Sequence, residues 1–550
     1  MKVKQGALPL NLRQMFEFRY ALLTWPLILV VVCFGLAGIF TDYQSLFVGV
    51  GAVFAAIAAL GVHDLTQTRH AILRNYPVAA HLRFILEKIR PEIRQYFFEA
   101  DTDGTPFPRD ARAMVYQRAK RELDKRPFGT QKDVYAEQYE WLHHSIAPRP
   151  PVPLSDMRVE VGASCAQPYR TSLLNISAMS YGALSANAVL SLNKGAQQGG
   201  FFHDTGEGGV SPHHRVHGGD LVWEVGSGYF GCRGDDAGFD PQKFRETASD
   251  PQIKMVELKL SQGAKPGHGG VLPAAKVTAE IAAIRGVPMG QDCVSPAHHS
   301  AFSTPVGLLE FVAQMRELSG GKPAGFKLCI GHPWEFLAIC KAMVQTGITP
   351  DFIVIDGKEG GTGAAPVEFM DHIGMPMRDG LTFAHNALVG IGMRDRVRIG
   401  AAGKIASAYD MARVLALGAD WCNSARGFMF AVGCIQAQSC HTGHCPTGVT
   451  SQDPARQRAI VVPDKAERVA NYHRNTLHAL SELVAAAGID HPADLKPHHF
   501  LRRASSDRVI SFAEQYEQLT PGQLLLDPKS SPRFGAAWSA AQAGSFAYRA

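Results

Sequence analysis

The sequence lacks the features that mark several common classes of protein. Its basic residues are scattered instead of gathered in one patch with interleaved aromatic residues, and the formal net charge is only +5 over 550 residues, so no nucleic-acid partner is expected. Its ten cysteines show no even, regular spacing, which argues against a secreted disulfide scaffold and favours a reducing compartment. No GxGxxG motif follows a predicted strand, so we expect any nicotinamide cofactor to bind on another subunit.

What is present is typical of a globular α/β enzyme. Apolar residues make up 46% of the chain, and there are 54 glycines. This composition excludes a disordered or fibrous protein. The length suffices for one large catalytic domain with accessory segments.

Two long runs near the start of the chain, residues 21–40 and 45–62, carry no charged residue. Each has about the length that a helix needs to cross a bilayer. The link between them carries only Asp42, whereas basic residues flank the pair on both sides: Lys2, Lys4, Arg13 and Arg19 before it, and Arg69, Arg74, Arg83 and Lys88 after it. By the positive-inside bias, residues 1–66 are predicted to form a transmembrane hairpin in the cell inner membrane with both ends in the cytoplasm. A cleaved signal peptide and a buried core helix pair are the alternatives.

The chain beyond the hairpin divides at a proline-rich segment. Residues 67–148 have the periodicity of basic, partly amphipathic helices, whose arginines face either anionic lipid or solvent. Residues 147–154, APRPPVPL, hold four prolines and end regular structure. We therefore expect a helical linker over 67–148, a catalytic domain over 149–455, and a C-terminal helical segment and tail over 456–550.

From residue 173 onward, short apolar runs alternate with helical stretches. The predicted strands are 173–180, 221–228, 253–260, 287–294, 324–331, 351–357, 396–403 and 420–426. Eight strands that alternate with helices favour a (β/α)8 TIM barrel, an α/β fold, and an open doubly wound sheet is the alternative. Six glycine-rich segments follow strand ends, where barrel active sites lie: 205–209, 261–270, 295–300, 356–364, 401–404 and 423–427.

Three cysteines share one short segment, GCIQAQSCHTGHCPTG. Cys434, Cys440 and Cys445 are separated by five and four residues on a loop rich in glycine and proline. Closely spaced thiolates of this kind ligate iron–sulfur clusters. Three ligands indicate a three-iron (3Fe-4S) cluster, or a four-iron cluster with one other ligand. Three buried cysteines in an irregular loop are the structural alternative.

Several segments, in order, resemble the FMN-binding synthase domain of glutamate synthase. They are SAMSYGALSANA, DTGEGG, LKLSQGAKPGHGGVLP, SPAHHS, DGKEGGTGAAP and GCIQAQSCHTGHCPTGV. The similarity covers about residues 150–490. It implies a barrel with FMN and a three-iron cluster, in which 2-oxoglutarate and ammonia form 2-iminoglutarate and reduced flavin supplies the hydride that gives L-glutamate.

The resemblance also implies roles for single residues. Glu207 and Lys259 would be catalytic, with Lys259 also approaching the polar edge of the flavin, where a cation stabilises the reduced anion. The 2-oxo acid would contact Gln262, Lys265 and Arg285, the last two of which would pair with its carboxylates. The flavin and its phosphate would contact Ser177, Ala178, Met179, Gly403, Lys404, Ser424, Ala425, Arg426 and Gly427. The cluster ligands would be Cys434, Cys440 and Cys445.

The chain departs from the family pattern at several points. Full-length bacterial members begin with a glutaminase that has an exposed N-terminal cysteine, whereas this chain starts MKVKQG and enters the predicted hairpin, so no glutaminase is expected. His268 stands where the family commonly has glutamate, and AAGK at 401–404 replaces a sequence like ADGG. These changes leave the identity of the oxo acid open.

Three classes of function remain at this point. The first is a membrane-anchored enzyme of glutamate-synthase type that takes electrons from ferredoxin, a partner flavoprotein subunit or the quinone pool. The second is a membrane-linked flavoenzyme that acts on another amino acid or oxo acid. The third is an inactive membrane module, which the intact cysteines and glycine loops disfavour.

Overall fold

The structure, a computed structural model, describes residues 15–549. The chain divides into two compact units, Met1–Gly104 and Thr105–Ala550, each of which is described by itself. The predicted flanking charges Lys2, Lys4 and Arg13 lie outside the described residues.

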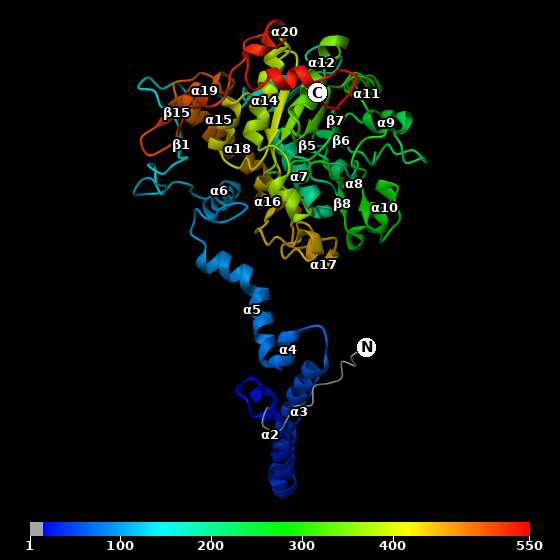
Figure 1. Ribbon diagram of the computed structural model, residues 1–550, viewed down its shortest axis with the longest axis vertical. Coiled ribbons are helices and arrows are strands. Elements are labelled where there is room, and N and C mark those ends of the chain that lie inside the picture. Colours follow the sequence, from blue (N-terminus) through cyan, green and yellow to red (C-terminus); the bar gives the residue numbers. More distant parts are fainter. Residues whose placement is uncertain (1–14, 550) are drawn as a thin grey trace. The chain divides into compact units, whose positions relative to one another are not determined.

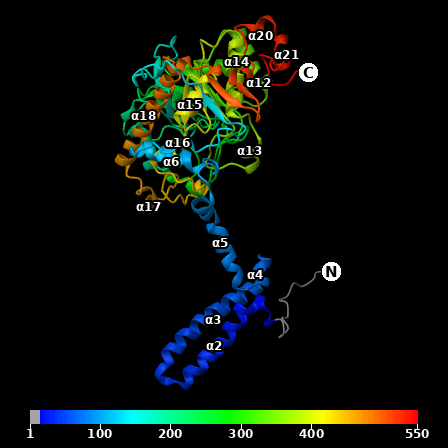
Figure 2. The same cartoon turned by 90° about the vertical axis from the view of Figure 1, so that its left-hand side faces the viewer.

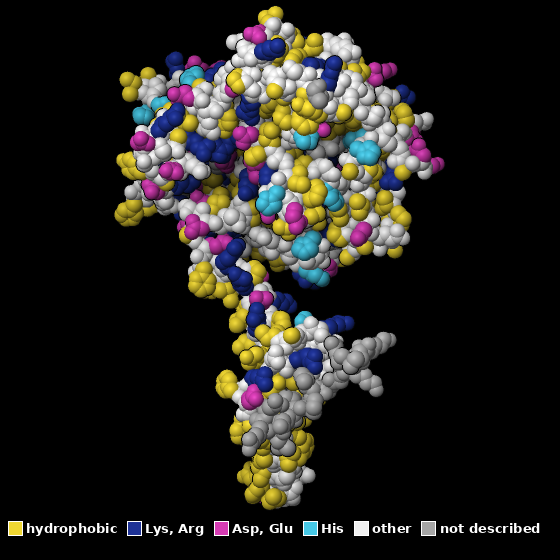
Figure 3. Space-filling view, viewed as in Figure 1, with side chains coloured by type: hydrophobic (Ala, Val, Ile, Leu, Met, Phe, Trp, Pro, Cys, Tyr) yellow, Lys and Arg dark blue, Asp and Glu magenta, His cyan; other side chains and the backbone are white. Residues whose placement is uncertain are grey.

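The first unit contains two apolar helices that run side by side, α2 (Ala21–Ile39) and α3 (Gln44–Thr66) (Figure 2). Both are long and apolar enough to be candidate membrane spans. Most of their side chains are exposed within this unit, for example Val31 at 73% and Val53 at 60%. Figure 3 shows hydrophobic side chains over much of the visible face of the hairpin. Within its own unit the hairpin is therefore not a buried core helix pair.

The hairpin is followed by α4 (Ala71–Asn75), α5 (Ala79–Ile93) and the π-helical turn Arg94–Phe98. Asp64 of α3 is fully buried and accepts hydrogen bonds from the backbone of Val78 at 2.8 Å and from His81 Nε2 at 3.0 Å. These bonds join the end of α3 to the start of α5.

The predicted helical linker over 67–148 is wrong beyond residue 120. After α6 (Arg109–Lys120), residues 121–139 form neither helix nor strand, and β1 (Glu140–Leu142) pairs antiparallel with β14 (Phe500–Arg503). Arg121 takes a left-handed conformation (φ 59°) that ends α6. Pro127 and Gly129 follow, and the apolar periodicity stops with them.

The second unit is built on a closed barrel of eight parallel strands. In chain order they are β4 (Leu174–Ile176), β5 (His203–Asp204), β6 (Leu221–Val225), β7 (Ile253–Lys259), β10 (Ala324–Leu328), β11 (Phe352–Asp356), β12 (Arg398–Ala402) and β13 (Trp421–Ser424). The predicted (β/α)8 fold is confirmed, and the open doubly wound sheet is excluded (Figure 1).

One predicted barrel strand is wrong. Residues 287–294 contribute only β9 (Cys293–Val294), which pairs antiparallel with β8 (Val271–Leu272) outside the barrel. The second barrel strand is instead β5, with only two residues. Consequently β7, which ends at Lys259, is the fourth barrel strand and not the third.

Helices follow the barrel strands and enclose them. They include α7 (Ala186–Gly199), α8 (Pro212–Arg215), α9 (Pro241–Ala248), α10 (Ala279–Arg285), α11 (Pro305–Leu318), α12 (Pro333–Thr346), α13 (Val367–His372), α14 (Met377–Gly390), α15 (Ala408–Ala416) and α16 (Arg426–Val432). Their ends follow local capping chemistry. The Ser185 hydroxyl accepts a hydrogen bond from Ala188 N at the start of α7, and Ser407 and Asp410 form a capping box on α15.

The remaining elements close the outside of the second unit. The long helix α18 (Val462–Ala486) packs against α6, α7, α15 and α16. The short elements are β2 (Arg158–Val161), β3 (Tyr169–Ser172), α17 (Pro454–Gln457), β15 (Val509–Ser511), α19 (Phe512–Gln515), α20 (Gln523–Leu526) and α21 (Gly535–Ala540). At the carboxyl ends of the barrel strands, the chain continues into the glycine-rich loops.

Candidate active site

A buried ion pair lies at the carboxyl ends of the barrel strands. Lys259 is the last residue of β7, and Glu207 follows β5; Lys259 Nζ lies 2.8 Å from Glu207 Oε1. Burial works to raise the pKa of Glu207, but the charges of Lys259, Arg285 and Lys265 outweigh it and hold the pKa at about 2. Glu207 is therefore ionised at neutral pH.

The fold brings both predicted carboxylate-binding cations to this glutamate. Lys265 is 2% exposed and donates to the carbonyl of Ala364 at 2.6 Å, and burial lowers its pKa to about 8. Arg285 is 5% exposed and donates to the carbonyl of Tyr181 at 3.0 Å. Gln262 is half-buried in the same loop as Lys265.

Arg285 is held in place from two sides. Its guanidinium lies 5.2 Å from the centre of the Phe230 ring, and Nη2 lies 3.4 Å from the hydroxyl of Ser180. The Nε atom has no hydrogen-bond partner. Three cations thus surround one carboxylate, an arrangement that leaves net positive charge for an anionic ligand.

The predicted flavin residues come together from the first, seventh and eighth barrel strands. Ser177 directly follows β4, and its backbone N–H donates to the carbonyl of Ser424 at 3.1 Å, which joins the first and eighth strands. Ala178 and Met179 continue the same loop and are half-buried. Ala425 directly follows β13.

The predicted phosphate loops carry two neighbouring cations. Burial lowers the pKa of Lys404, and the charge of Arg426 lowers it further. Gly403 has φ 152°, and a Cβ there would lie 2.9 Å from the Cβ of Met377. At Gly427 a Cβ would lie 2.5 Å from the hydroxyls of both Ser424 and Tyr472. Side chains thus pack closely against both glycines, and the two neighbouring cations Lys404 and Arg426 suit a phosphate group.

The three predicted cluster cysteines line one small cavity of about 10 Å³. Cys434 follows α16, Cys440 begins a short 3₁₀ turn, and Cys445 lies beyond it. Burial raises the pKa of Cys434 to about 12 and raises that of Cys440. Burial acts in the same direction on Cys445, but hydrogen bonds from Thr447 and Thr450 lower its pKa overall. Three sulfurs around one cavity fit an iron–sulfur cluster.

The cysteine loop is attached to the loop that carries the predicted flavin residues. The backbone N–H of Ser185 donates to the carbonyl of Val449 at 2.9 Å. The side chain of Gln452 donates to the carbonyls of Gly182 at 3.0 Å and Leu184 at 2.8 Å. Segments about 270 residues apart in the chain therefore form one unit.

Three further buried residues of this region are not among the predicted site residues. Lys276 donates to the carbonyl of Cys440 at 3.3 Å. His299 is bonded through Nε2 to the carbonyl of Lys259 at 2.8 Å and so helps to place the end of β7. Lys327 pairs with Glu224 and lies 3.6 Å from Glu257 in the barrel interior. The segment SPAHHS gave a signal for His299; single lysines in predicted strands or turns gave none.

The barrel interior also holds an acidic cluster. Ligand atoms of Asp204, Glu224 and Glu257 lie within 4.8 Å of one another. Because the ammonium group of Lys327 already lies among these carboxylates, we interpret the cluster as an ion-pair network.

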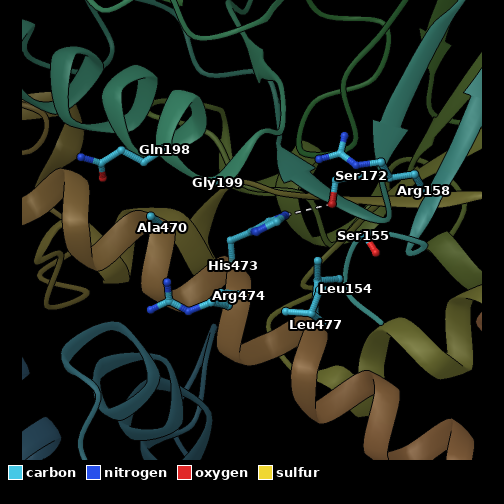
Figure 4. Close-up of a pocket in the computed structure, with 10 residues that line it drawn as sticks. All are labelled: Leu154, Ser155, Arg158, Ser172, Gln198, Gly199, Ala470, His473, Arg474 and Leu477. Carbon is cyan, nitrogen blue, oxygen red and sulfur yellow. Dashed lines mark hydrogen bonds between the residues drawn. The ribbon is translucent and has the colours of Figure 1, made fainter. Parts of the chain in front are cut away.

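A separate cavity of about 280 Å³ lies near the amino-terminal ends of the barrel strands. Figure 4 shows Arg158, Ser172, His473 and Arg474 in its wall, with a hydrogen bond of 2.9 Å between Ser172 Oγ and His473 Nε2. None of the predicted site residues lines it.

The fold and these loops define a (β/α)8 enzyme with a charged rim and a cysteine loop beside it. The conserved region of glutamate synthase matches residues 129–490. The chain is 37% identical over 490 residues to the glutamate synthase large subunit-like protein YerD of Bacillus subtilis, with 82% of this chain and 93% of that protein covered.

It is also 36% identical over 316 residues to the archaeal-type glutamate synthase [NADPH] of Thermotoga neapolitana. That match covers 57% of this chain and 59% of the relative. The chain belongs to the glutamate synthase family, and it is an oxidoreductase that acts on CH–NH2 donors.

Proposed function

We propose that this protein is an FMN- and iron–sulfur-dependent oxidoreductase that converts 2-oxoglutarate and ammonia to L-glutamate. The observation that carries the proposal is the buried Glu207 with Lys259, Lys265 and Arg285 around it, on the barrel rim that also bears the cysteine loop. We assign the chemistry to residues 149–455.

The cofactors have matching surroundings. Ser177, Ala178 and Met179 would border the flavin ring, and the loops at 403–404 and 424–427 would hold its phosphate. Cys434, Cys440 and Cys445 would ligate a 3Fe-4S cluster. When bound, the flavin supplies hydride transfer and the cluster supplies one-electron transfer.

The chain's own residues bind and orient the substrate. Lys265 and Arg285 are the cations available for the two carboxylates of a dicarboxylic oxo acid, and charge-assisted bonds of this kind fix orientation. Ionised Glu207 pairs with Lys259, whose Nζ lies 2.8 Å away, and so fixes this cation at the end of β7. There it would stabilise negative charge on the reduced flavin. Lys259, Lys265 and Arg285 are buried and the Glu207 side chain is only 14% exposed, which limits the access of water and strengthens these interactions.

A second candidate function is a flavoenzyme that acts on another oxo acid or amino acid. His268 favours it, because this position commonly holds glutamate in the family. The His268 ring packs at 5.3 Å against Phe369, and Nδ1 lies 2.8 Å from the carbonyl of Gly269. The residue therefore offers an aromatic contact where a carboxylate is usual.

We also propose that the hairpin anchors the catalytic unit to the cytoplasmic side of the inner membrane. Its length, composition and exposure within its unit support this assignment. The electrons would come from ferredoxin, a flavoprotein subunit or the quinone pool, and the anchor favours a membrane-linked donor.

The test uses the full chain purified in detergent. Its flavin and iron contents are measured, and the reduced protein is mixed anaerobically with oxo acids and ammonia. Reoxidation of the flavin by 2-oxoglutarate only when ammonia is present supports the proposal. No reoxidation by this pair, but reoxidation by another oxo acid, favours the second candidate.

The variant Arg285→Ala identifies the substrate site. Loss of one charge-assisted hydrogen bond costs about 1.5–3 kcal/mol, so about 10- to 150-fold more 2-oxoglutarate should be needed for reoxidation. The control is Arg245→Ala on the exposed surface of α9, which should change nothing. An equal effect of both variants, or loss of flavin from Arg285→Ala, would contradict the assignment.

A further inference from the structure

Lys276 is a buried cation with no carboxylate partner. It ends the 3₁₀ turn Ala274–Lys276, and its side chain is buried, with the residue 2% exposed. Its Nζ atom donates to the carbonyls of Ala183 at 3.0 Å and Cys440 at 3.3 Å. Among the residues that the structure describes, no carboxylate forms an ion pair with it.

A buried ammonium group is costly unless an anion compensates its charge. Two backbone carbonyls satisfy its hydrogen bonds, but they carry only partial charges. One of these carbonyls belongs to Cys440, in the loop that also carries Cys445. An anionic group held by Cys440 and Cys445 would therefore compensate the positive charge of Lys276.

The two bonds of Lys276 join the two cofactor loops. Ala183 lies four residues beyond Met179 in the loop after β4, and Cys440 belongs to the cysteine loop. Arg285, whose charge acts on Lys276, binds Tyr181 of that same β4 loop. Lys276 thus lies between the predicted flavin loop and the predicted cluster.

We propose that the positive charge of Lys276 raises the reduction potential of the iron–sulfur cluster; this inference rests on the proposed function. A cluster with three thiolates is anionic and gains one negative charge when a one-electron donor of the ferredoxin class reduces one ferric ion to ferrous. No bond breaks and no proton moves. A fixed positive charge in a low-dielectric surrounding stabilises the more negative state more strongly.

The test is a redox titration of the full chain, in which electron paramagnetic resonance and visible absorption monitor the state of the cluster. Dithionite serves as the one-electron donor. Lys276→Gln keeps a donor for the two carbonyls and removes the charge. We expect the equilibrium constant for cluster reduction to fall about tenfold, which is a shift of about 59 mV to lower potential for a one-electron couple.

Two further variants separate charge from structure. Lys276→Arg should keep the wild-type potential. Lys322→Gln is the matched control, because Lys322 is also buried and donates to two backbone carbonyls, of Ala248 and Asp250, but precedes β10 at the opposite end of the barrel strands. It should leave the potential unchanged.

The remaining outcomes either support or overturn the proposal. An unchanged potential in Lys276→Gln with full iron content overturns the proposal, as does an equal fall in Lys276→Arg. If Lys276→Gln loses iron, retention of iron by Lys276→Arg supports a role of the charge, and loss from both variants shows a packing role and overturns it. A wild-type protein without iron contradicts the proposed cluster itself, which is a distinct result from an unchanged potential.

Discussion

At the scale of single residues, Glu207 depends on the charges around it. Burial raises its pKa, yet Lys259, Arg285 and Lys265 lower the pKa from 4.5 to about 2. Because the pKa is lower in the folded state, ionised Glu207 stabilises the protein fully above about pH 4.5. That contribution is lost as the pH falls through about 2.

The variant Glu207→Gln should therefore unfold at a lower temperature than the wild type at about pH 6. The difference should shrink by about pH 3, where part of the wild-type contribution is lost. Thermal unfolding of both proteins across this pH range measures the difference in unfolding temperature. A difference that does not depend on pH would contradict the ion pair.

A second prediction at this scale concerns Cys440. Cys440→Ser should lose iron and acid-labile sulfide but keep FMN, since the predicted flavin contacts come from other loops. Cys165→Ser is the control, because Cys165 lies near Asp351 and Arg316 at the other end of the barrel. Unchanged iron in Cys440→Ser would exclude the cysteine loop as a cluster site.

At the scale of elements, barrel closure places like charges side by side. Asp204, Glu224, Glu257 and Asp356 come from four of five successive strands, and Lys327 of β10 lies among them. Burial lowers the pKa of Lys327, but these carboxylates raise it overall. Burial together with Glu224 raises the pKa of Asp204 to about 7.

Removal of this one cation should therefore destabilise the barrel strongly. Lys327→Met leaves uncompensated buried carboxylates, which costs about 3–5 kcal/mol, and its Tm should fall by several degrees. The control is Lys254→Met on β7, which breaks a partly exposed pair with Asp220 at 3.6 Å that contributes about 0–1 kcal/mol. Equal Tm values for the two variants would show that the network does not stabilise the barrel.

At the scale of the whole molecule, the two units have different surfaces. The first exposes apolar side chains along α2 and α3, whereas the second buries a continuous hydrophobic core within and around the barrel. The division falls at Gly104, well beyond the predicted hairpin boundary at residue 66. The segment from α4 to the π-helical turn thus belongs to the first unit.

A chain that begins at Thr105 should therefore remain soluble and keep its flavin, while the full chain sediments with membranes. The reason is that the predicted flavin and cluster residues all lie in the second unit. Sedimentation with salt-washed membranes compares the two chains. If the shorter chain still sediments, the anchor lies elsewhere.

The sequence by itself determined the class of fold, seven of the eight barrel strands, the two apolar helices and the family. These are encoded in local periodicity and in short motifs. Only the tertiary structure identified β5, because a strand of two residues is too short to show a period, and only it moved residues 287–294 out of the barrel. The contact of Lys276 with Cys440, 164 residues away, likewise required the folded chain, because pairings at long separation follow from barrel closure and loop packing, which no local pattern encodes.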